Sequence, residues 1–133
     1  MPPSPRLTVL SAEAEAFLAE NHICTFTTLR PDGSPHTAPV RFTWESESGL
    51  ARVMTTMTRR KARNLLVAPG SRVSVCQSAG WRWITLEGAA TISTDPDRVM
   101  EGIRRYTKRY RSPPPQPPHL AVVEIRVDRV LGG

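Results

Sequence analysis

The feature that most constrains the fold of this chain is a series of short segments rich in β-branched residues, each bounded by turn residues. In the turn between the first two segments, Pro31 presets its φ angle and Gly33 accepts a positive one, so the turn joins two strands as a hairpin. The same patterning predicts strands over residues 23–29, 35–44, 50–56, 72–78 and 81–93, and a last strand in which Val123, Ile125 and Val127 point inward. Six short strands with few helices predict a mainly β fold, a small six-stranded barrel or roll in which closure removes exposed edges.

Three short helices are expected beside these strands. Apolar residues at helical spacing predict helices over residues 11–20 and 59–68, which Ser11 and Thr58 respectively can cap. A third helix begins at Pro96, a residue type favoured in the first helical turn.

The whole chain, residues 1–133, is expected to form one domain. Two Pro-rich stretches stand outside the regular elements, a tail at residues 1–9 and a linker at residues 112–118 before the last strand. Gly88 lies inside a long strand and predicts a bulge or a bend in the barrel wall.

Charge and apolar content limit the classes of partner. The net charge is +6 at pH 7 and the pI is about 10.3, a balance that attracts anions. No apolar stretch approaches the roughly 18 residues needed to span a membrane, and the first residues lack the apolar core of a signal peptide. We therefore expect a cytoplasmic protein with no membrane association. Cys24 and Cys76 are expected to be reduced thiols, and neither the cysteines nor the histidines show metal-ligand spacing.

The segment from Met54 to Leu65 is the most informative about function. It is a strand ending in hydroxyl residues, followed by a short turn and a helix that opens with cations. The free N–H groups and the dipole of a helix N-terminus favour anions, so cations there are badly placed unless an anion neutralises them. A phosphate is the natural occupant. The cations concerned are Arg59, Arg60, Lys61 and Arg63.

Two other interpretations of this segment stay open. A solvated basic turn costs only about a few tenths of a kcal/mol per charge. A nucleic-acid surface is the second alternative, and another basic cluster would extend it: Arg104, Arg105, Lys108, Arg109 and Arg111. No nucleic-acid motif is present, however, and the aromatic residues do not alternate with the basic run as stacking platforms would. No nucleic-acid partner is therefore expected.

The same segment, Thr55-Thr56 followed by a turn and Lys61-Ala62-Arg63-Asn64-Leu65, and the later Gln77-Ser78 resemble the flavin-binding split β-barrel family. This is the superfamily of pyridoxamine 5′-phosphate oxidase. The likeness covers nearly the whole chain and includes the early hairpin before Pro39-Val40. The basic helix start is most similar to the branch that binds the deazaflavin coenzyme F420. The resemblance implies a six-stranded, dimeric split barrel of the FMN-binding type.

The resemblance also implies a set of cofactor-binding residues. One group matches the strand that lines the ring system, a second matches the phosphate side, and a third matches a Gln-Ser pair that reaches the cofactor. In this chain they are Pro39, Val40 and Arg41; Thr55, Thr56, Arg60, Lys61, Ala62 and Asn64; and Gln77 and Ser78. No catalytic side chain is implied, because the cofactor carries the chemistry.

The implied function is that of an F420-dependent oxidoreductase, which transfers a hydride to a small electron-poor organic acceptor. An FMN-dependent oxidoreductase on the same fold is an alternative, as is a protein that binds flavin, deazaflavin or haem without turnover. The chain departs from the oxidases themselves, because it ends directly after the last strand, at Leu131-Gly132-Gly133, without their substrate-binding extension. Oxidation of vitamin B6 is therefore not expected.

A homodimer is expected because a small barrel is filled by its own side chains, so that a cofactor site must lie outside it, where a second subunit can cover it. Trp81 and Trp83 are two residues apart on one strand and so share a face. They are interpreted as core or dimer-interface residues, with a wall of the substrate pocket as the alternative.

Overall fold

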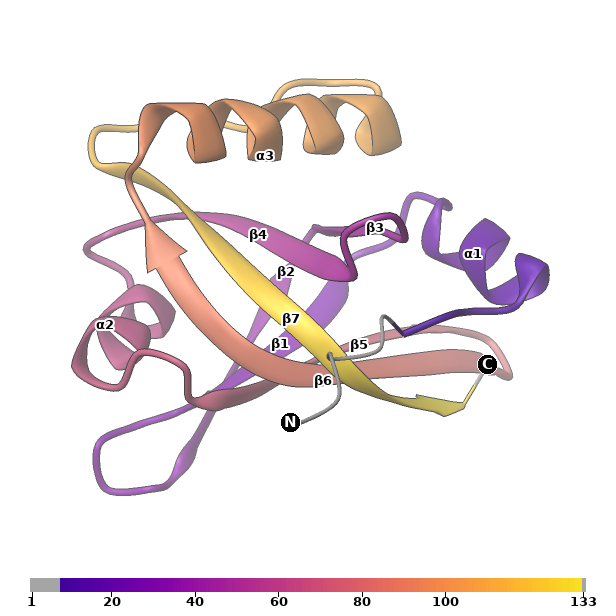
Figure 1. The fold of residues 1–133 in the computed structure, drawn as a ribbon, viewed down its shortest axis with the longest axis horizontal. Helices are drawn as coiled ribbons and strands as arrows, with labels where there is room; N and C mark the ends of the chain where they lie inside the picture. Colours follow the sequence, from indigo (N-terminus) through magenta and orange to yellow (C-terminus); the bar gives the residue numbers. More distant parts are fainter. Residues whose placement is uncertain (1–7, 133) are drawn as a thin grey trace, which may run out of the picture.

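The computed structural model describes residues 8–132, and it shows one antiparallel sheet that curls into a split barrel with three helices around it (Figure 1). Residues 1–7 of the predicted tail lie outside the described residues, whereas Thr8 is tied to the barrel by a hydrogen bond to the carbonyl oxygen of Val127. In chain order the elements are α1 (Ala12–Leu18), β1 (Cys24–Leu29), β2 (Pro35–Val40), β3 (Phe42–Glu45), β4 (Leu50–Thr56), α2 (Arg60–Val67), β5 (Arg72–Ala79), β6 (Arg82–Ser93), α3 (Pro96–Tyr110) and β7 (Leu120–Gly132).

The number of strands is seven rather than six. The predicted strand over 35–44 is interrupted at Arg41, so that β2 ends at Val40 and β3 begins at Phe42. The two halves then pair with different partners, β2 with β1 and β3 with β4. Sequence patterning missed the break because both halves are extended, and local patterns do not show with which strand each half pairs.

This break explains why the sheet curls. The strand order is β2-β1-β5-β6-β7-β4-β3, so the two edge strands are consecutive in the chain and are separated by Arg41 alone. The edges must therefore meet at that residue. Beyond it they diverge, because β3 pairs with β4 only between residues 50 and 53, which leaves Met54–Thr56 without a partner on that side. The barrel is closed at Arg41 and split next to it.

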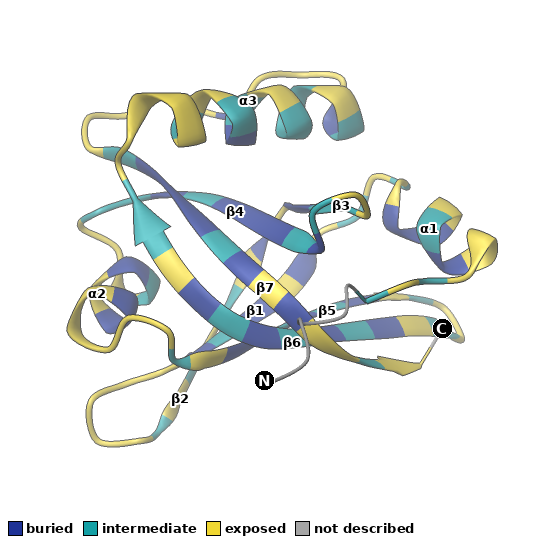
Figure 2. Ribbon diagram, in the orientation of Figure 1, coloured by how far each residue is buried: buried dark blue, intermediate teal, exposed yellow. Residues whose placement is uncertain are grey.

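The interior of the curl holds the apolar core. Inward-facing residues alternate with exposed ones along the strands, and Val123, Ile125 and Val127 of β7 point inward as predicted (Figure 2). The predicted bulge at Gly88 is confirmed by a register shift between β6 and β7, where an added Cβ would lie 1.9 Å from the carbonyl oxygen of Arg126.

The helices cover the ends and the outer face of the barrel. Helix α1 is capped by Ser11, whose hydroxyl accepts from the N–H of Ala14, as predicted. Helix α3 starts with Pro96 after the N-cap Asp95 and packs across β3, β4 and β7. Helix α2 differs from the prediction in its cap, because the N-cap is Arg59 rather than Thr58 and contributes no side-chain hydrogen bond. Within the described residues, no helix is both long and apolar enough to cross a membrane.

Candidate functional site

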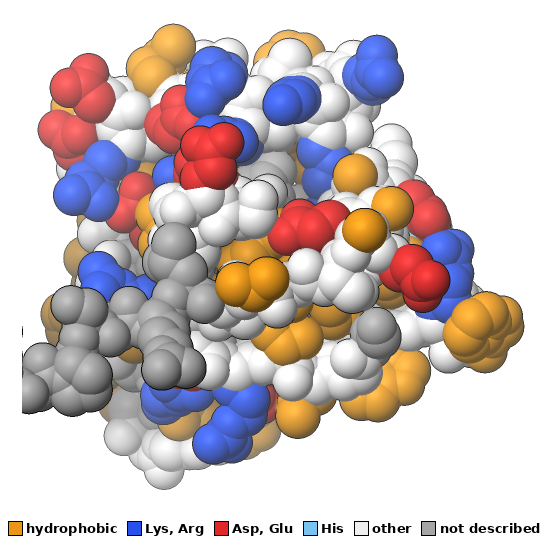
Figure 3. All heavy atoms as spheres, turned by 45° about the vertical axis from the view of Figure 1, so that its right-hand side comes forward, with side chains coloured by type: hydrophobic (Ala, Val, Ile, Leu, Met, Phe, Trp, Pro, Cys, Tyr) orange, Lys and Arg blue, Asp and Glu red, His pale blue; other side chains and the backbone are white. Residues whose placement is uncertain are grey.

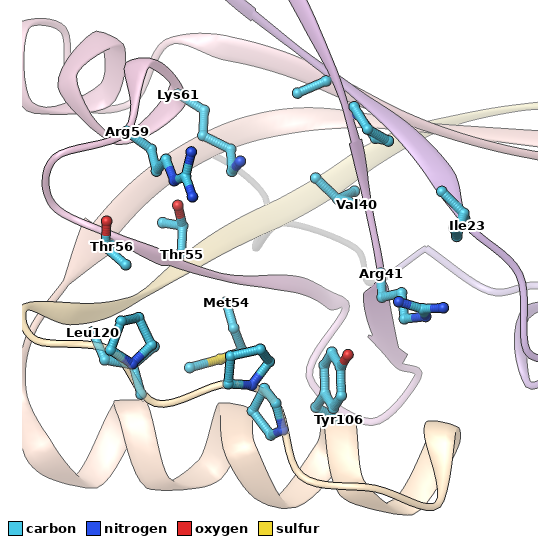
Figure 4. Close-up of a pocket in the computed structure, with 15 residues that line it drawn as sticks. Ile23, Val40, Arg41, Met54, Thr55, Thr56, Arg59, Lys61, Tyr106 and Leu120 are labelled. Carbon is cyan, nitrogen blue, oxygen red and sulfur yellow. The ribbon is translucent and has the colours of Figure 1, made fainter.

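A cavity of about 560 Å³, open to solvent, occupies the split of the barrel. Its walls come from the end of β2, the unpaired end of β4, the start of α2, and α3 with the Pro-rich segment that follows it (Figure 4). The lining residues are Ile23, Ala38, Pro39, Val40, Arg41, Met54, Thr55, Thr56, Arg59, Lys61, Tyr106, Pro114, Pro115, Pro117 and Leu120.

The split gives this cavity two backbone edges. Strand β2 is paired on one side only, with β1, and the end of β4 is paired on one side only, with β7. Each therefore turns unpaired backbone groups towards the cavity, and a buried N–H or C=O group calls for a partner. A planar ligand with carbonyl and ring N–H groups, lying between the two strands, would supply such partners.

The end of the cavity at α2 has the features of an anion site. Helix α2 begins at Arg60, and its first turn has no side-chain cap, which leaves backbone N–H groups free for an anion. Arg59 and Lys61 extend into the same region from either side of that first residue (Figure 4). Thr55 is 7% exposed, and its hydroxyl has no hydrogen-bond partner within residues 8–132. A buried, unpaired hydroxyl that lines a cavity indicates that a ligand atom completes its bonding.

Electrostatics support the same conclusion. Partial burial lowers the pKa of Lys61 from its ordinary value, and the neighbouring positive charge of Arg59 lowers it further. No carboxylate within the described residues forms an ion pair with either cation. Two like charges held together without a counter-ion are unfavourable until an anion such as phosphate binds between them.

The wall of the cavity around Met54 and the segment after α3 is apolar. Met54 projects from β4, and an added Cβ at Gly102 of α3 would lie 2.5 Å from its sulfur atom, so that glycine allows the helix to approach closely. The segment that was interpreted as a linker forms the rest of this wall, with Pro114 buried and Pro115 and Pro117 exposed. Proline has no N–H group, so this wall offers apolar contact and few donors.

Six of the predicted cofactor residues come together at this cavity. They are Pro39, Val40, Arg41, Thr55, Thr56 and Lys61. Arg60 and Ala62 belong to the first turn of α2, but the Arg60 side chain is exposed outside the cavity and the Ala62 side chain is fully buried. Arg60 and Ala62 can contact an anion in the cavity through their backbone N–H groups.

The other three predicted residues lie elsewhere in the protomer. Asn64 is buried behind α2, where its amide donates to the hydroxyl of Thr28 at 2.9 Å. Gln77 is fully buried in the barrel and donates to the carbonyl oxygen of Phe17 at 2.6 Å. Ser78 is exposed on β5. A cofactor contact from Gln77 or Ser78 within one protomer does not follow from this arrangement.

Several lining residues were not predicted from the sequence. Arg59 was predicted only as one of several cations at the helix start, and a precise helix boundary would have identified it as the N-cap. Tyr106 was not assigned to a site, and the prolines were interpreted as a linker. No local signal shows that this helix packs beside the split, because its position is set by long-range contacts with β4 and β7.

A separate recess lies between α1 and the β5–β6 turn. Trp81 is 89% exposed and Trp83 is 48% exposed, and both line this recess together with Phe17. Hydrophobic side chains gather at the lower right of Figure 3, the side on which Figure 1 places that turn. The two tryptophans are therefore not core residues of the protomer, and they do not line the cavity in the split.

A curled antiparallel sheet with a cavity in its split is the architecture of a split β-barrel. The sequence matches the pyridoxamine 5′-phosphate oxidase family over residues 10–132, and the chain belongs to this family. It is 44% identical over 126 residues to a protein of Mycobacterium tuberculosis (strain CDC 1551 / Oshkosh) named F420H(2)-dependent biliverdin reductase, with 94% of this chain and 89% of that protein covered.

Solved structures agree on the fold. A conserved hypothetical protein of Mycobacterium tuberculosis superimposes with a TM-score of 0.77 at 23% identity, covering 99% of this chain and 89% of that one. A structure described as an F420 reductase gives a TM-score of 0.68 at 23% identity, covering 88% of this chain and 94% of that one. At such identities the likeness shows the split barrel alone.

Proposed function

We propose that this protein is an F420-dependent oxidoreductase that reduces a conjugated, electron-poor organic acceptor. The observation that carries this proposal lies at the start of α2. There, two cations without an acidic partner in residues 8–132 and the unpaired Thr55 hydroxyl meet at one end of a cavity. The 44% identity to an F420H2-dependent reductase supports a deazaflavin as the phosphate-bearing ligand. When bound in reduced form, F420 supplies a hydride.

The residues of the chain bind and orient the two reactants. The phosphate would be held by Arg59, Lys61 and the first N–H groups of α2. The hydroxyl of Thr55 would donate a hydrogen bond to a phosphate oxygen. The unpaired edges of β2 and β4 would hold the ring system between them. The apolar wall opposite would position the acceptor and exclude water from the ring.

Biliverdin is the first acceptor to test, because the 44% identical relative is named for its reduction. It is a linear tetrapyrrole in which an electron-poor bridging carbon can accept a hydride while a ring nitrogen takes up a proton. The prolines and Met54 offer an extended apolar surface for such a conjugated body.

Anaerobic assays test the proposal directly. We expect oxidised F420 to bind in a fluorescence titration, and reduced F420 to be consumed when the protein and biliverdin are both present. FMN provides the competing cofactor, and a protein that retains FMN would be yellow. If FMN binds and F420 does not, the deazaflavin assignment is wrong.

We further propose that the protein is a homodimer in solution. The cavity is open on one side, and the exposed Trp81 and Trp83, together with Leu131 at 43% exposure, form apolar surface suited to an interface. Light scattering should give twice the chain mass of 14.8 kDa. Trp81→Ser should shift the equilibrium towards the monomer, and a monomeric parent protein at micromolar concentration would exclude the dimer.

A further inference from the structure

The cavity in the split has a second positive pole, formed by Arg41 at the seam where β2 passes into β3. Arg59 and Lys61 lie at the α2 end, whereas Arg41 lies across Val40 from them, on the side of Tyr106 (Figure 4). The cofactor role implied for Arg41 is that of the backbone of a strand lining the ring system, and neither this role nor the phosphate site at α2 accounts for its side chain. Its side chain is exposed at the edge of the cavity and is available to a ligand.

The lack of an acidic partner distinguishes Arg41 from many arginines of this chain. Within residues 8–132, ion pairs with Asp or Glu are formed by Arg52, Arg72, Arg82, Arg98, Arg104, Arg105 and Arg129. Arg41 forms none of these, and its guanidinium lies instead over the ring of Tyr110, at 5.9 Å from the centroid. An aromatic face holds an arginine in place without neutralising its charge.

Tyr106 adds a neutral polar group beside this pole. Its ring packs against that of Tyr110 with centroids 4.7 Å apart and the planes tilted by 48°, so Arg41 and Tyr106 both pack on the buried Tyr110 beside the cavity. The Tyr106 hydroxyl has no hydrogen-bond partner inside the described part of the chain, and in Figure 4 it points towards Arg41. A guanidinium and a phenol hydroxyl side by side form a site for a carboxylate.

We propose that Arg41, assisted by Tyr106, binds a carboxylate of the acceptor and thereby selects acidic conjugated acceptors over neutral ones. This inference rests on the proposed function. Because the acidic tail of F420 is attached through its phosphate, that tail leaves the cavity at the α2 end, so the Arg41 pole is available to the second reactant. The proline wall between the poles would contact the apolar body of the acceptor.

The test compares biliverdin, which carries two carboxylates, with its neutral dimethyl ester. Both are titrated into protein loaded with oxidised F420, and both are used as acceptors with reduced F420. Arg41→Gln should weaken biliverdin binding and raise its KM about tenfold, while leaving the values for the ester and the Kd of F420 unchanged. Tyr106→Phe should act in the same direction by a factor of about three.

A matched control separates this local effect from net charge. Arg126→Gln removes the same charge from an exposed position on β7 outside the cavity, and should change none of these values. Arg41→Lys should restore part of the discrimination, because it keeps the charge but not the planar fork.

The outcomes distinguish this inference from the proposed function. A parent protein that binds no F420 overturns the proposed function and this assignment with it. If F420 binds but Arg41→Gln affects acid and ester equally, or if the parent does not discriminate between them, Arg41 is not a carboxylate site. A weaker Kd for F420 in Arg41→Gln would make Arg41 a cofactor residue instead and would equally overturn the inference.

Discussion

Arg109, at one end of the barrel, and Lys61, in the split, are both partly withdrawn from water. They differ in whether other residues of the chain satisfy their charged groups. Arg109 donates to the carbonyl oxygens of Glu20 and Phe42 and to the amide oxygen of Gln77, at distances of 2.6 to 3.0 Å. Lys61 has no acidic partner within residues 8–132, and burial lowers its pKa. A cation whose donors are satisfied by its own chain is structural, whereas one held without partners beside a cavity indicates a ligand.

The largest expected effect concerns Arg109. Its guanidinium lies 5.0 Å from the centroid of the Phe42 ring and 4.9 Å from that of Tyr110, and joins α3 to β3, β5 and the end of α1. Arg109→Met would leave the carbonyl oxygen of Glu20 without this donor and the amide oxygen of Gln77 with only the weak thiol donor of Cys24. We therefore expect a loss of about 3 kcal/mol in the free energy of unfolding. Urea denaturation measures it. Lys108→Met on the same helix is the control, with an expected change within about 0.5 kcal/mol.

An equal loss of stability in the two variants would mean that the hydrogen bonds of Arg109 contribute no more than an exposed side chain. Arg109 would then not be a structural cation, and its contrast with Lys61 would not hold.

The second effect falls on binding and spares the fold. Lys61→Ala should weaken F420 binding on the order of 10- to 100-fold, because a charge-assisted contact in a partly buried site contributes about 1.5–3 kcal/mol. The midpoint of thermal unfolding without cofactor should stay the same or rise, since a repulsion with Arg59 is removed. Arg63→Ala, an exposed neighbour on the same helix that does not line the cavity, is the matched control. Unchanged affinity in Lys61→Ala, by fluorescence titration, would contradict the anion site.

Local sequence patterns predicted most of the elements and the cations that line the α2 end of the cavity. Strand alternation, the Pro31–Gly33 turn, the Ser11 cap and the Gly88 bulge all depend on neighbouring residues, and the structure confirms each of them. The cations at the helix start were recognisable for the same reason, since a helix boundary and its charges are local features.

The features that the sequence did not predict depend on contacts between segments far apart in the chain. The break at Arg41 follows from two halves of one extended run pairing with different strands, which no local propensity encodes. Gln77 was assigned to the cofactor by resemblance, but in this protomer it is buried between Phe17 and Arg109, residues 60 and 32 positions away. The proline wall was unpredictable in the same way, because its position depends on where α3 packs.

A smaller effect should appear as the pH is raised. An anion bound at α2 raises the pKa of Lys61 in the complex above the lowered value of the free protein, so the complex holds that proton more tightly. Affinity for F420 should therefore be full below the lowered pKa of free Lys61 and fall as the pH rises through it. Titrations from neutral pH up to the ordinary pKa of a lysine, about 10.4, would record the decline. Lys61→Arg, which keeps its charge over this range, should bind with little dependence on pH, and a decline of equal size in that variant would assign it to another group.

The smallest effect is expected from the exposed cations of α3, the remaining basis for a nucleic-acid surface. Basic and acidic side chains alternate along this helix at the top of Figure 3, and Glu101 accepts from both Arg104 and Arg105. Salt bridges of this kind reduce the positive field that a phosphate backbone would meet. Arg104→Gln combined with Lys108→Gln should leave F420 affinity unchanged within about twofold, because neither residue lines the cavity.

Salt dependence provides the decisive contrast for this helix. For a cofactor held by two cations, a plot of log affinity against log salt concentration should fall with a slope of about one to two. For a nucleic-acid strand bound along the helix, the slope would be about 0.7–0.9 for each phosphate contact. Arg109 must be left intact in this experiment, since its loss would disturb the barrel itself. Tight oligonucleotide binding with a steep slope, abolished in the double variant, together with an absence of F420 binding by the parent, would show that the cations at α2 belong to a nucleic-acid surface.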